Sequence, residues 1–256
     1  MFPKIAPTDE TENKLVADAL HYAERGWLVF PLHAVKDGKC TCAKADCNSP
    51  AKHPRTAQGL KQARKDFDLV ENLFSSFTYA SANIGVCTGK GSNLVVVDID
   101  AAKGGQIEEL YSFVSQETLE KTLRVKTGGG FHLYFAYPLN AEIRNSTDKL
   151  GSKIDVRGEG GYVVAPPSMH ISGKQYEFLN NNNLMPFPQA FIEKLNKSEL
   201  RTTNGTERGK LIESESFLDG SRNDSLARIA DHFADPTTTC RPLYDDLLDK
   251  LADSGK

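Results

Sequence analysis

Apolar and polar positions along the chain change between the period of a helix and the period of a strand. Residues 12–25 carry apolar side chains at helical spacing, and Gly26 follows as a C-terminal cap. The same spacing predicts helices over residues 60–77, 106–116, 188–200, 224–233 and 243–252. Short apolar runs predict strands over residues 27–32, 83–88, 94–100, 123–127, 131–137, 153–156 and 162–165. Strands interleaved with helices indicate an α/β or α+β fold.

Turns and composition changes divide the chain into parts. Residues 89–92 are expected to join two strands, and residues 158–161 to close a hairpin. Residues 12–200 are predicted to form one domain, with a small aperiodic module inserted at about 36–58. The polar residues 201–210 are predicted to be a linker, and residues 211–256 a C-terminal helical segment.

The composition is typical of a folded, soluble protein, with 39% hydrophobic and 25% charged residues. No stretch reaches the ~20 apolar residues of a membrane-spanning helix, and residues 1–12 are polar, unlike a secretory signal. We therefore expect a cytoplasmic protein that binds no membrane. The net charge of -3 gives no sign of nucleic-acid binding, yet residues 36–65 hold eight Lys/Arg against two acids. Residues 213–256 hold ten acids against five Lys/Arg, and solvated faces would explain either charge pattern.

Three cysteines and a histidine form a metal-binding pattern within the inserted module: Cys40, Cys42, Cys47 and His53. Three thiols and an imidazole can close a tetrahedral zinc site, although the C-x-C spacing is tighter than the usual C-x2-C. An odd number of cysteines without a secretory signal favours metal over disulfides. Because residues 36–55 have too few apolar groups for a core of their own, the zinc is predicted to be structural.

Asp98 and Asp100 follow a run of apolar, β-forming residues. Because residues i and i+2 of a strand point to the same face, these two carboxylates would lie together, about 7 Å apart. Such a pair can hold divalent metal, and two-metal sites suit phosphoryl transfer. A D-x-D motif alone also occurs at ordinary strand edges and turns, so it becomes specific only in combination.

Two later motifs carry candidate ligands for phosphate. Thr127 precedes Gly128, Gly129 and Gly130, whose backbone N–H groups can approach an anion, and His132 opens the aromatic strand that follows. Asp155 and Arg157 alternate onto one face of a further strand, where the acid could complete a metal site and the guanidinium could clamp phosphate. Taken singly, the motifs also fit a surface hairpin and a surface salt bridge.

In this order the motifs resemble the bifunctional primase–polymerase domain of the archaeo-eukaryotic primase superfamily. That superfamily shows D-x-D, then a small residue-x-His, then a third acid, which match Asp98/Asp100, Gly130-Phe131-His132 and Asp155. Residues 22–32, 83–86 and 161–168 are similar to its opening and connecting segments, and the likeness covers roughly residues 15–180. Many members carry serine where Gly130 stands, so Thr127 or backbone N–H groups would supply the phosphate contact of that serine.

The resemblance implies an α/β (α+β) catalytic domain with an RRM-like sheet that synthesises primers and extends them on single-stranded DNA, in plasmid, phage or mobile-element replication. By position, Asp98, Asp100 and Asp155 would hold two Mg²⁺ or Mn²⁺ ions, one for the attacking hydroxyl and one for the triphosphate. His132 would contact the triphosphate, and Arg157 would be a second phosphate contact.

Some members carry a Cys/His module at the same place, which supports the zinc prediction. The basic residues around it would grip template or the 5′ end of a nascent primer. Because the catalytic acids lie elsewhere in the sequence, Cys42→Ser is predicted to spare extension more than initiation. Residues 217–226 look like the start of the helical segment that follows the catalytic domain in this family.

The implied partners are a single-stranded DNA template, a primer and NTP or dNTP, and the protein is expected to be a monomer. No Walker-type G-x-x-x-x-G-K-[ST] pattern is present, so a separate replicative helicase is a candidate partner. The alternatives are a gap-filling or end-joining polymerase of the same superfamily, a non-catalytic zinc-stabilised nucleic-acid-binding module, and a two-metal nuclease. The complete acid and histidine set counts against the inactive module, and the glycine-rich turn counts against the nuclease.

Overall fold

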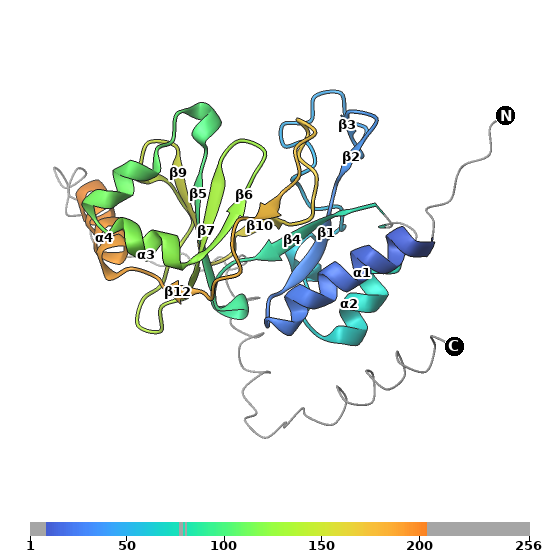
Figure 1. Cartoon of the computed structure of the whole chain (residues 1–256), viewed down its shortest axis with the longest axis horizontal. Coiled ribbons are helices and arrows are strands. Elements are labelled where there is room, and N and C mark those ends of the chain that lie inside the picture. Colours follow the sequence, from blue (N-terminus) through green and yellow to red (C-terminus); the bar gives the residue numbers. More distant parts are fainter. Residues whose placement is uncertain (1–8, 77–78, 80, 204–256) are drawn as a thin grey trace, which may run out of the picture. The chain divides into compact units, whose positions relative to one another are not determined.

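The computed structural model describes residues 9–76, 79 and 81–203, and two sheets form its scaffold (Figure 1). The larger sheet has the strand order β11-β6-β7-β5-β9-β8, with β12 added parallel to β7 and all other pairs antiparallel. Its strands are β5 (Leu94–Ile99), β6 (Leu123–Lys126), β7 (Phe131–Ala136), β8 (Ser146–Gly151), β9 (Ile154–Arg157), β11 (Glu177–Phe178) and β12 (Met185–Pro186).

The smaller sheet is antiparallel and has the order β1-β4-β10. Its strands are β1 (Val29–Leu32), β4 (Asn83–Cys87) and β10 (Tyr162–Ala165). The hairpin of β2 (Val35–Lys36) and β3 (Lys39–Cys40), which was not predicted from the sequence, leads from β1 into residues 36–58.

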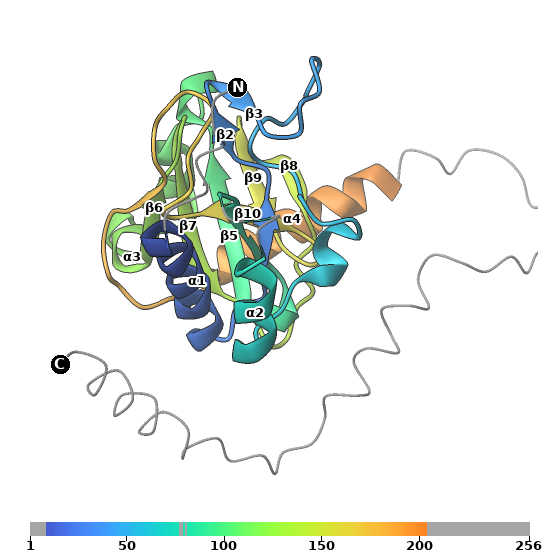
Figure 2. The same cartoon turned by 90° about the vertical axis from the view of Figure 1, so that its right-hand side faces the viewer.

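Helices cover both sheets. The helices α1 (Asp9–Glu24) and α2 (Phe67–Phe74) lie side by side next to the smaller sheet, while α4 (Gln189–Thr203) lies by the larger one (Figure 1, Figure 2). The other helical segments are α3 (Gln116–Lys121) and the short 3-10 turns η1 (Gly59–Gln62), η3 (Lys90–Ser92), η4 (Ala101–Lys103) and η5 (Ile107–Ser112). The predicted mixture of helices and sheet, an α+β fold, is confirmed.

The alternation of side chains along β5 divides the apolar residues into two cores. Leu94 and Val96 belong to the core that includes α1, α2 and the smaller sheet. Val95, Val97 and Ile99 belong to the core on the opposite face, which α4 closes. Because every second residue shares a face, Asp98 continues the row of Leu94 and Val96. The first core therefore ends in a polar site at this end of the strand.

The structure corrects several predicted elements. Residues 60–77 are not one helix but η1 followed by α2, whose N-cap Asp66 accepts a hydrogen bond from the Leu69 N–H. Residues 106–116 are mostly the 3-10 segment η5. The predicted hairpin at 158–161 is wrong, because β9 pairs with β5 in the larger sheet and β10 pairs with β4 in the smaller one. The loop therefore carries the chain from one sheet to the other, and residues 89–92 do the same between β4 and β5.

The end of the described chain limits what can be compared. The helix α4 runs to Thr203, so the first three residues of the predicted linker are helical. The predicted C-terminal helices, with His232 in the first and Cys240 between the two, lie outside the described residues. Within the described ranges, no helix has the length and apolar character needed to cross a membrane.

Candidate functional site

Strand register places three of the predicted site residues in one row. Asp98 on β5 lies directly opposite His132 on β7 and, on its other side, opposite Asp155 on β9. Cross-strand neighbours have Cβ atoms roughly 5 Å apart and point to the same face. Asp100 follows two residues after Asp98, just past the end of the strand. Hydrogen bonding of the sheet thus brings together groups that are up to 57 positions apart in the sequence.

These residues open into one cavity of about 850 Å³. Seven of the predicted site residues line it: Asp98, Asp100, Thr127, Gly129, His132, Asp155 and Arg157. Gly130 is not among the lining residues. Several groups that the sequence did not single out also line the cavity, among them Lys52, Lys103, His170 and Tyr176. The motif spacing gives no signal for these four, since only the tertiary fold carries them to the acids.

The carboxylates of the site are paired with cations of the chain itself. Arg157 Nη2 donates to Asp155 Oδ2 at 2.8 Å and lies 3.9 Å from Asp98 Oδ2. Lys103 Nζ lies 2.8 Å from Asp100 Oδ2. Burial raises the pKa of Asp155, and the nearby Asp98 carboxylate adds to the rise, while Arg157 opposes it. The fold therefore gathers negative charge that it only partly neutralises.

His132 is almost completely buried, with its side chain 6% exposed. Its Nε2 lies 3.5 Å from Asp98 Oδ1, whereas its Nδ1 is buried with no hydrogen-bond partner among the described residues. Burial lowers the pKa of His132, the positive charges of Lys52 and Arg157 lower it further, and Asp98 opposes them. At neutral pH the ring is therefore a neutral imidazole that can donate one N–H.

The glycine-rich turn is held by Thr127. Its Oγ1 accepts hydrogen bonds from the N–H groups of Gly129 and Gly130, at 3.3 and 2.9 Å. These two N–H groups are thus engaged within the turn rather than offered to a phosphate, whereas the Thr127 hydroxyl proton remains available to donate. A Cβ at position 130 would lie 1.9 Å from the carbonyl oxygen of Ile99, so this backbone excludes the serine that many superfamily members carry there.

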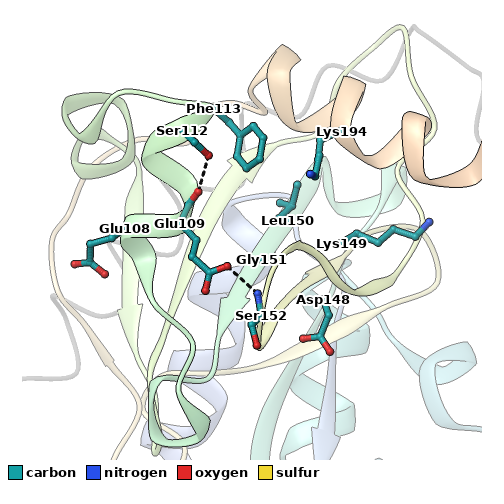
Figure 3. A pocket seen from close by; sticks show the side chains of 10 residues that line it. All are labelled: Glu108, Glu109, Ser112, Phe113, Asp148, Lys149, Leu150, Gly151, Ser152 and Lys194. Atoms are coloured by element: carbon teal, nitrogen blue, oxygen red, sulfur yellow. Dashed lines mark hydrogen bonds between the residues drawn. The ribbon is translucent and has the colours of Figure 1, made fainter. Parts of the chain in front are cut away.

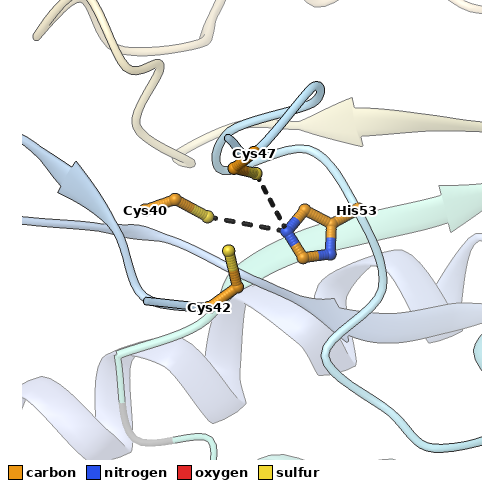
Figure 4. Close-up of side chains that lie close together, drawn as sticks. All are labelled: Cys40, Cys42, Cys47 and His53. Carbon is orange, nitrogen blue, oxygen red and sulfur yellow. Dashed lines mark hydrogen bonds between the residues drawn. The ribbon is translucent and has the colours of Figure 1, made fainter. Parts of the chain in front are cut away.

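The predicted zinc ligands come together in the inserted module (Figure 4). The ligand atoms of Cys40, Cys42, Cys47 and His53 all lie within 4.8 Å of one another. His53 Nε2 lies 3.6 Å from Cys40 Sγ and 3.5 Å from Cys47 Sγ. A tetrahedral zinc ion with the usual bond lengths requires sulfur–nitrogen separations of about 3.5 Å. The cluster therefore fits zinc in both ligand type and spacing.

The three carboxylates of the candidate site fit a different class of metal. Their oxygen donors suit Mg²⁺ or Mn²⁺, which prefer carboxylate and phosphate oxygens. In this structure Asp100 is turned to Lys103 and Asp155 to Arg157, so the chain's own cations stand where divalent charge would be needed. Both cations are partly exposed, at 72% for Lys103 and 35% for Arg157, and so have room to move.

A second cavity, of about 650 Å³, lies between η5, β8 and α4 (Figure 3). The Ser112 hydroxyl donates to the Glu109 carbonyl, and the Glu109 carboxylate accepts from the Ser152 N–H (Figure 3). None of the predicted site residues lines this cavity. Elsewhere, Cys87 is buried in the core that includes the smaller sheet, and burial raises its pKa to about 12.

Comparison with known proteins gives a match to a family model. The family model described as "Bifunctional DNA primase/polymerase, N-terminal" matches residues 19–190, which contain the whole site and the Cys/His module. No curated protein matches the chain.

Proposed function

The chain belongs to the bifunctional DNA primase/polymerase family, and from that premise we propose that it synthesises primers and extends them on a single-stranded DNA template. Membership of this family supports a general DNA primase/polymerase activity, with DNA and nucleotides as substrates. The proposal adds de novo initiation, two-metal phosphoryl transfer, and a role in the replication of a plasmid, phage or mobile element.

The row of His132, Asp98 and Asp155 across three hydrogen-bonded strands, with Asp100 beside it, is the observation that carries the proposal. Three converging carboxylates repel one another and destabilise the fold unless positive charge is supplied. Arg157 and Lys103 reduce this repulsion in the present structure. In a complex with substrate, metal ions would supply part of the positive charge instead. If the D-x-D motif were only an ordinary strand end, it would not require a histidine and a third acid on the neighbouring strands.

In the proposed reaction each residue has a defined task. Asp98, Asp100 and Asp155 would hold two divalent cations, which supply activation of the attacking hydroxyl and charge neutralisation of the triphosphate. Neutral His132 donates its N–H to a triphosphate oxygen, and Thr127 can donate its hydroxyl proton beside it. Arg157 uses one Nη2 hydrogen bond on Asp155, so its other N–H groups can contact phosphate. Most of the rate then comes from positioning and electrostatics.

We also propose the roles of the other parts of the chain. Residues 12–200 form the catalytic domain, in which the module at 36–58 is ordered by a structural zinc ion bound to Cys40, Cys42, Cys47 and His53. Residues 201–210 would connect it, in part as the last turn of α4, to a helical segment over residues 211–256. The protein would act as a monomer, with a separate replicative helicase as a candidate partner.

Labelled nucleotides on unprimed and primed single-stranded DNA, with Mg²⁺ or Mn²⁺, test the proposal. We expect products on both substrates, and no product from Asp98→Ala at an unchanged melting temperature. Products on the primed substrate alone would indicate the gap-filling alternative, and degradation of the DNA would indicate a nuclease. DNA binding without either product would indicate the non-catalytic module.

A further inference from the structure

The Cys/His module is part of the wall of the catalytic cavity. Ser49 and Lys52 lie in the loop between Cys47 and His53, and both line the cavity with the three acids. Within this loop Asn48, Ser49 and Lys52 are exposed and only Ala51 is buried, so the shape of the loop depends on the contacts that fix its backbone. Lys52 itself is exposed, which leaves its ammonium group free to meet a ligand in the cavity.

Hydrogen bonds connect the backbone around Lys52 to the Cys/His cluster and to the smaller sheet. The Ala51 N–H donates to Cys40 Sγ at 3.3 Å, and the Ala51 carbonyl accepts from Asn83 Nδ2 at 2.9 Å. The Lys52 carbonyl accepts from Tyr162 Oη at 3.0 Å. The contact with Cys40 makes the position of Lys52 depend on the Cys/His cluster, and the other two contacts join the loop to β4 and β10.

Asn83 extends this support across the cavity. Its buried side chain donates to the carbonyl of Met169 at 2.8 Å and accepts from the Met169 N–H at 2.9 Å. Met169 precedes His170, whose ring lies against the backbone of Gly128 and lines the cavity. One buried amide thus sets the spacing between the lysine of the module and the glycine-rich turn.

Lys52 also differs from the other cations of the cavity in having no acidic partner. Arg157 pairs with Asp155, Lys103 with Asp100, and Lys153 with Asp148, whereas no ion pair within the described part of the chain involves Lys52. Burial is the main cause of the lowered pKa of His132 and His170, and the positive charge of Lys52 lowers both further. An unpaired cation beside a cavity that has to accept a triphosphate is available for phosphate.

We propose that Lys52 binds the triphosphate of the incoming nucleotide, and that the Cys/His module acts on the reaction by positioning this lysine. The inference rests on the proposed nucleotidyl transfer and names a further residue for it. It also changes the expectation drawn from the sequence alone, in which loss of the module impairs initiation and spares extension. If the module positions Lys52, its loss raises the nucleotide KM in both reactions.

Calorimetric titration of dGTP and, separately, of single-stranded DNA tests this at fixed ionic strength with Mg²⁺. Lys52→Ala is expected to raise the dGTP Kd about tenfold, which corresponds to one charge-assisted hydrogen bond. The Kd for DNA should change less than about twofold. In primer extension the KM for nucleotide should rise more than kcat falls, and Lys52→Arg should recover most of the affinity. Lys44→Ala is the matched control, because Lys44 is an exposed lysine of the same module that does not line the cavity.

The role of the module is tested by a double-mutant comparison. Cys42→Ser should raise the dGTP Kd as Lys52→Ala does, and adding Lys52→Ala to Cys42→Ser should change it little further. If Cys42→Ser does not fold, a zinc-selective chelator applied to wild type and Lys52→Ala gives the same comparison. Normal dGTP binding by Lys52→Ala, a loss confined to DNA, or an equal effect of Lys44→Ala would overturn the assignment. If wild type still synthesises DNA when one of these outcomes is found, only the assignment of Lys52 fails and the proposed function stands. If wild type synthesises no DNA, the proposed function itself is refuted.

Discussion

Replacement of Asp155 by asparagine is expected to remove nucleotide addition while leaving the metal-free fold as stable as wild type. The substitution keeps the shape of the side chain and removes one charge from the row on β7, β5 and β9. Losing one ligand of a two-metal centre costs several kcal/mol of transition-state stabilisation. A loss of about 4 kcal/mol lowers the rate roughly a thousandfold.

The effect on stability comes from two opposing contributions. The Arg157–Asp155 ion pair is partly exposed, at 35% and 24%, and pairs of this kind contribute at most about 1 kcal/mol. Against that, burial and the Asp98 carboxylate raise the pKa of Asp155, so the fold disfavours its ionised form. The two nearly cancel, and we expect the melting temperature in chelator to change by less than about 4 °C.

The raised pKa also fixes the sign of the pH dependence. A carboxyl group with a raised pKa in the folded state stabilises the fold at low pH, and this contribution is lost as the pH rises through that value. Ionisation of Asp155 should therefore lower the stability of wild type as the pH rises through the raised pKa. Asp155→Asn cannot ionise there, so its stability should lack this part of the decline. Added Mn²⁺ should raise the melting temperature of wild type and leave the variant unchanged.

The assays are primer extension and thermal unfolding with Mn²⁺ or chelator. Glu142→Gln is the control, because it removes the carboxylate charge from an exposed arginine–carboxylate pair, at 2.9 Å, outside the cavity. It should retain wild-type synthesis and the response to Mn²⁺. Synthesis by Asp155→Asn above about a tenth of wild type would refute the metal assignment. A fall of more than about 10 °C in chelator would show that the carboxylate is structural.

Three further predictions follow from the geometry of the site and of the module. His132→Ala should weaken binding of triphosphate more than binding of DNA, measured by separate titrations at fixed salt, and a selective loss of DNA affinity would contradict it. Gly130→Ser should cost roughly 1–3 kcal/mol in denaturant unfolding, since its Cβ would meet the Ile99 carbonyl at 1.9 Å. Gly129→Ser, whose Cβ meets nothing closer than 3.2 Å, should cost less, and equal losses would be against this explanation. Elemental analysis should find one zinc per chain, and Cys42→Ser should lose it; wild-type protein purified without chelator and free of zinc would end the zinc assignment.

Local patterns were enough to locate many of the helices and strands and to single out the residues of the candidate site. Short runs of β-forming residues located β5, β6 and β7. The runs of β5 and β7 are almost continuously apolar because both faces of these strands are buried, whereas β6 buries one face more than the other. The order of D-x-D, histidine and third acid identified the acids, and the close spacing of three cysteines and a histidine identified the second cluster. Each of these motifs spans only a few residues, so it can be recognised without knowledge of the fold.

The tertiary structure decided what lies beyond a few residues. The loop at 158–161 is short enough for a hairpin, yet β9 and β10 join different sheets, because their partners β5 and β4 are distant in sequence. Thr127 binds Gly129 and Gly130 within the turn instead of leaving them to phosphate. Lys52, a residue with no motif of its own, reaches the acids because contacts of its loop with Cys40, Asn83 and Tyr162 hold it there. Sequence patterns report local backbone preference and donor chemistry, whereas proximity across sheets depends on register and on buried hydrogen bonds between distant segments, which no local pattern encodes.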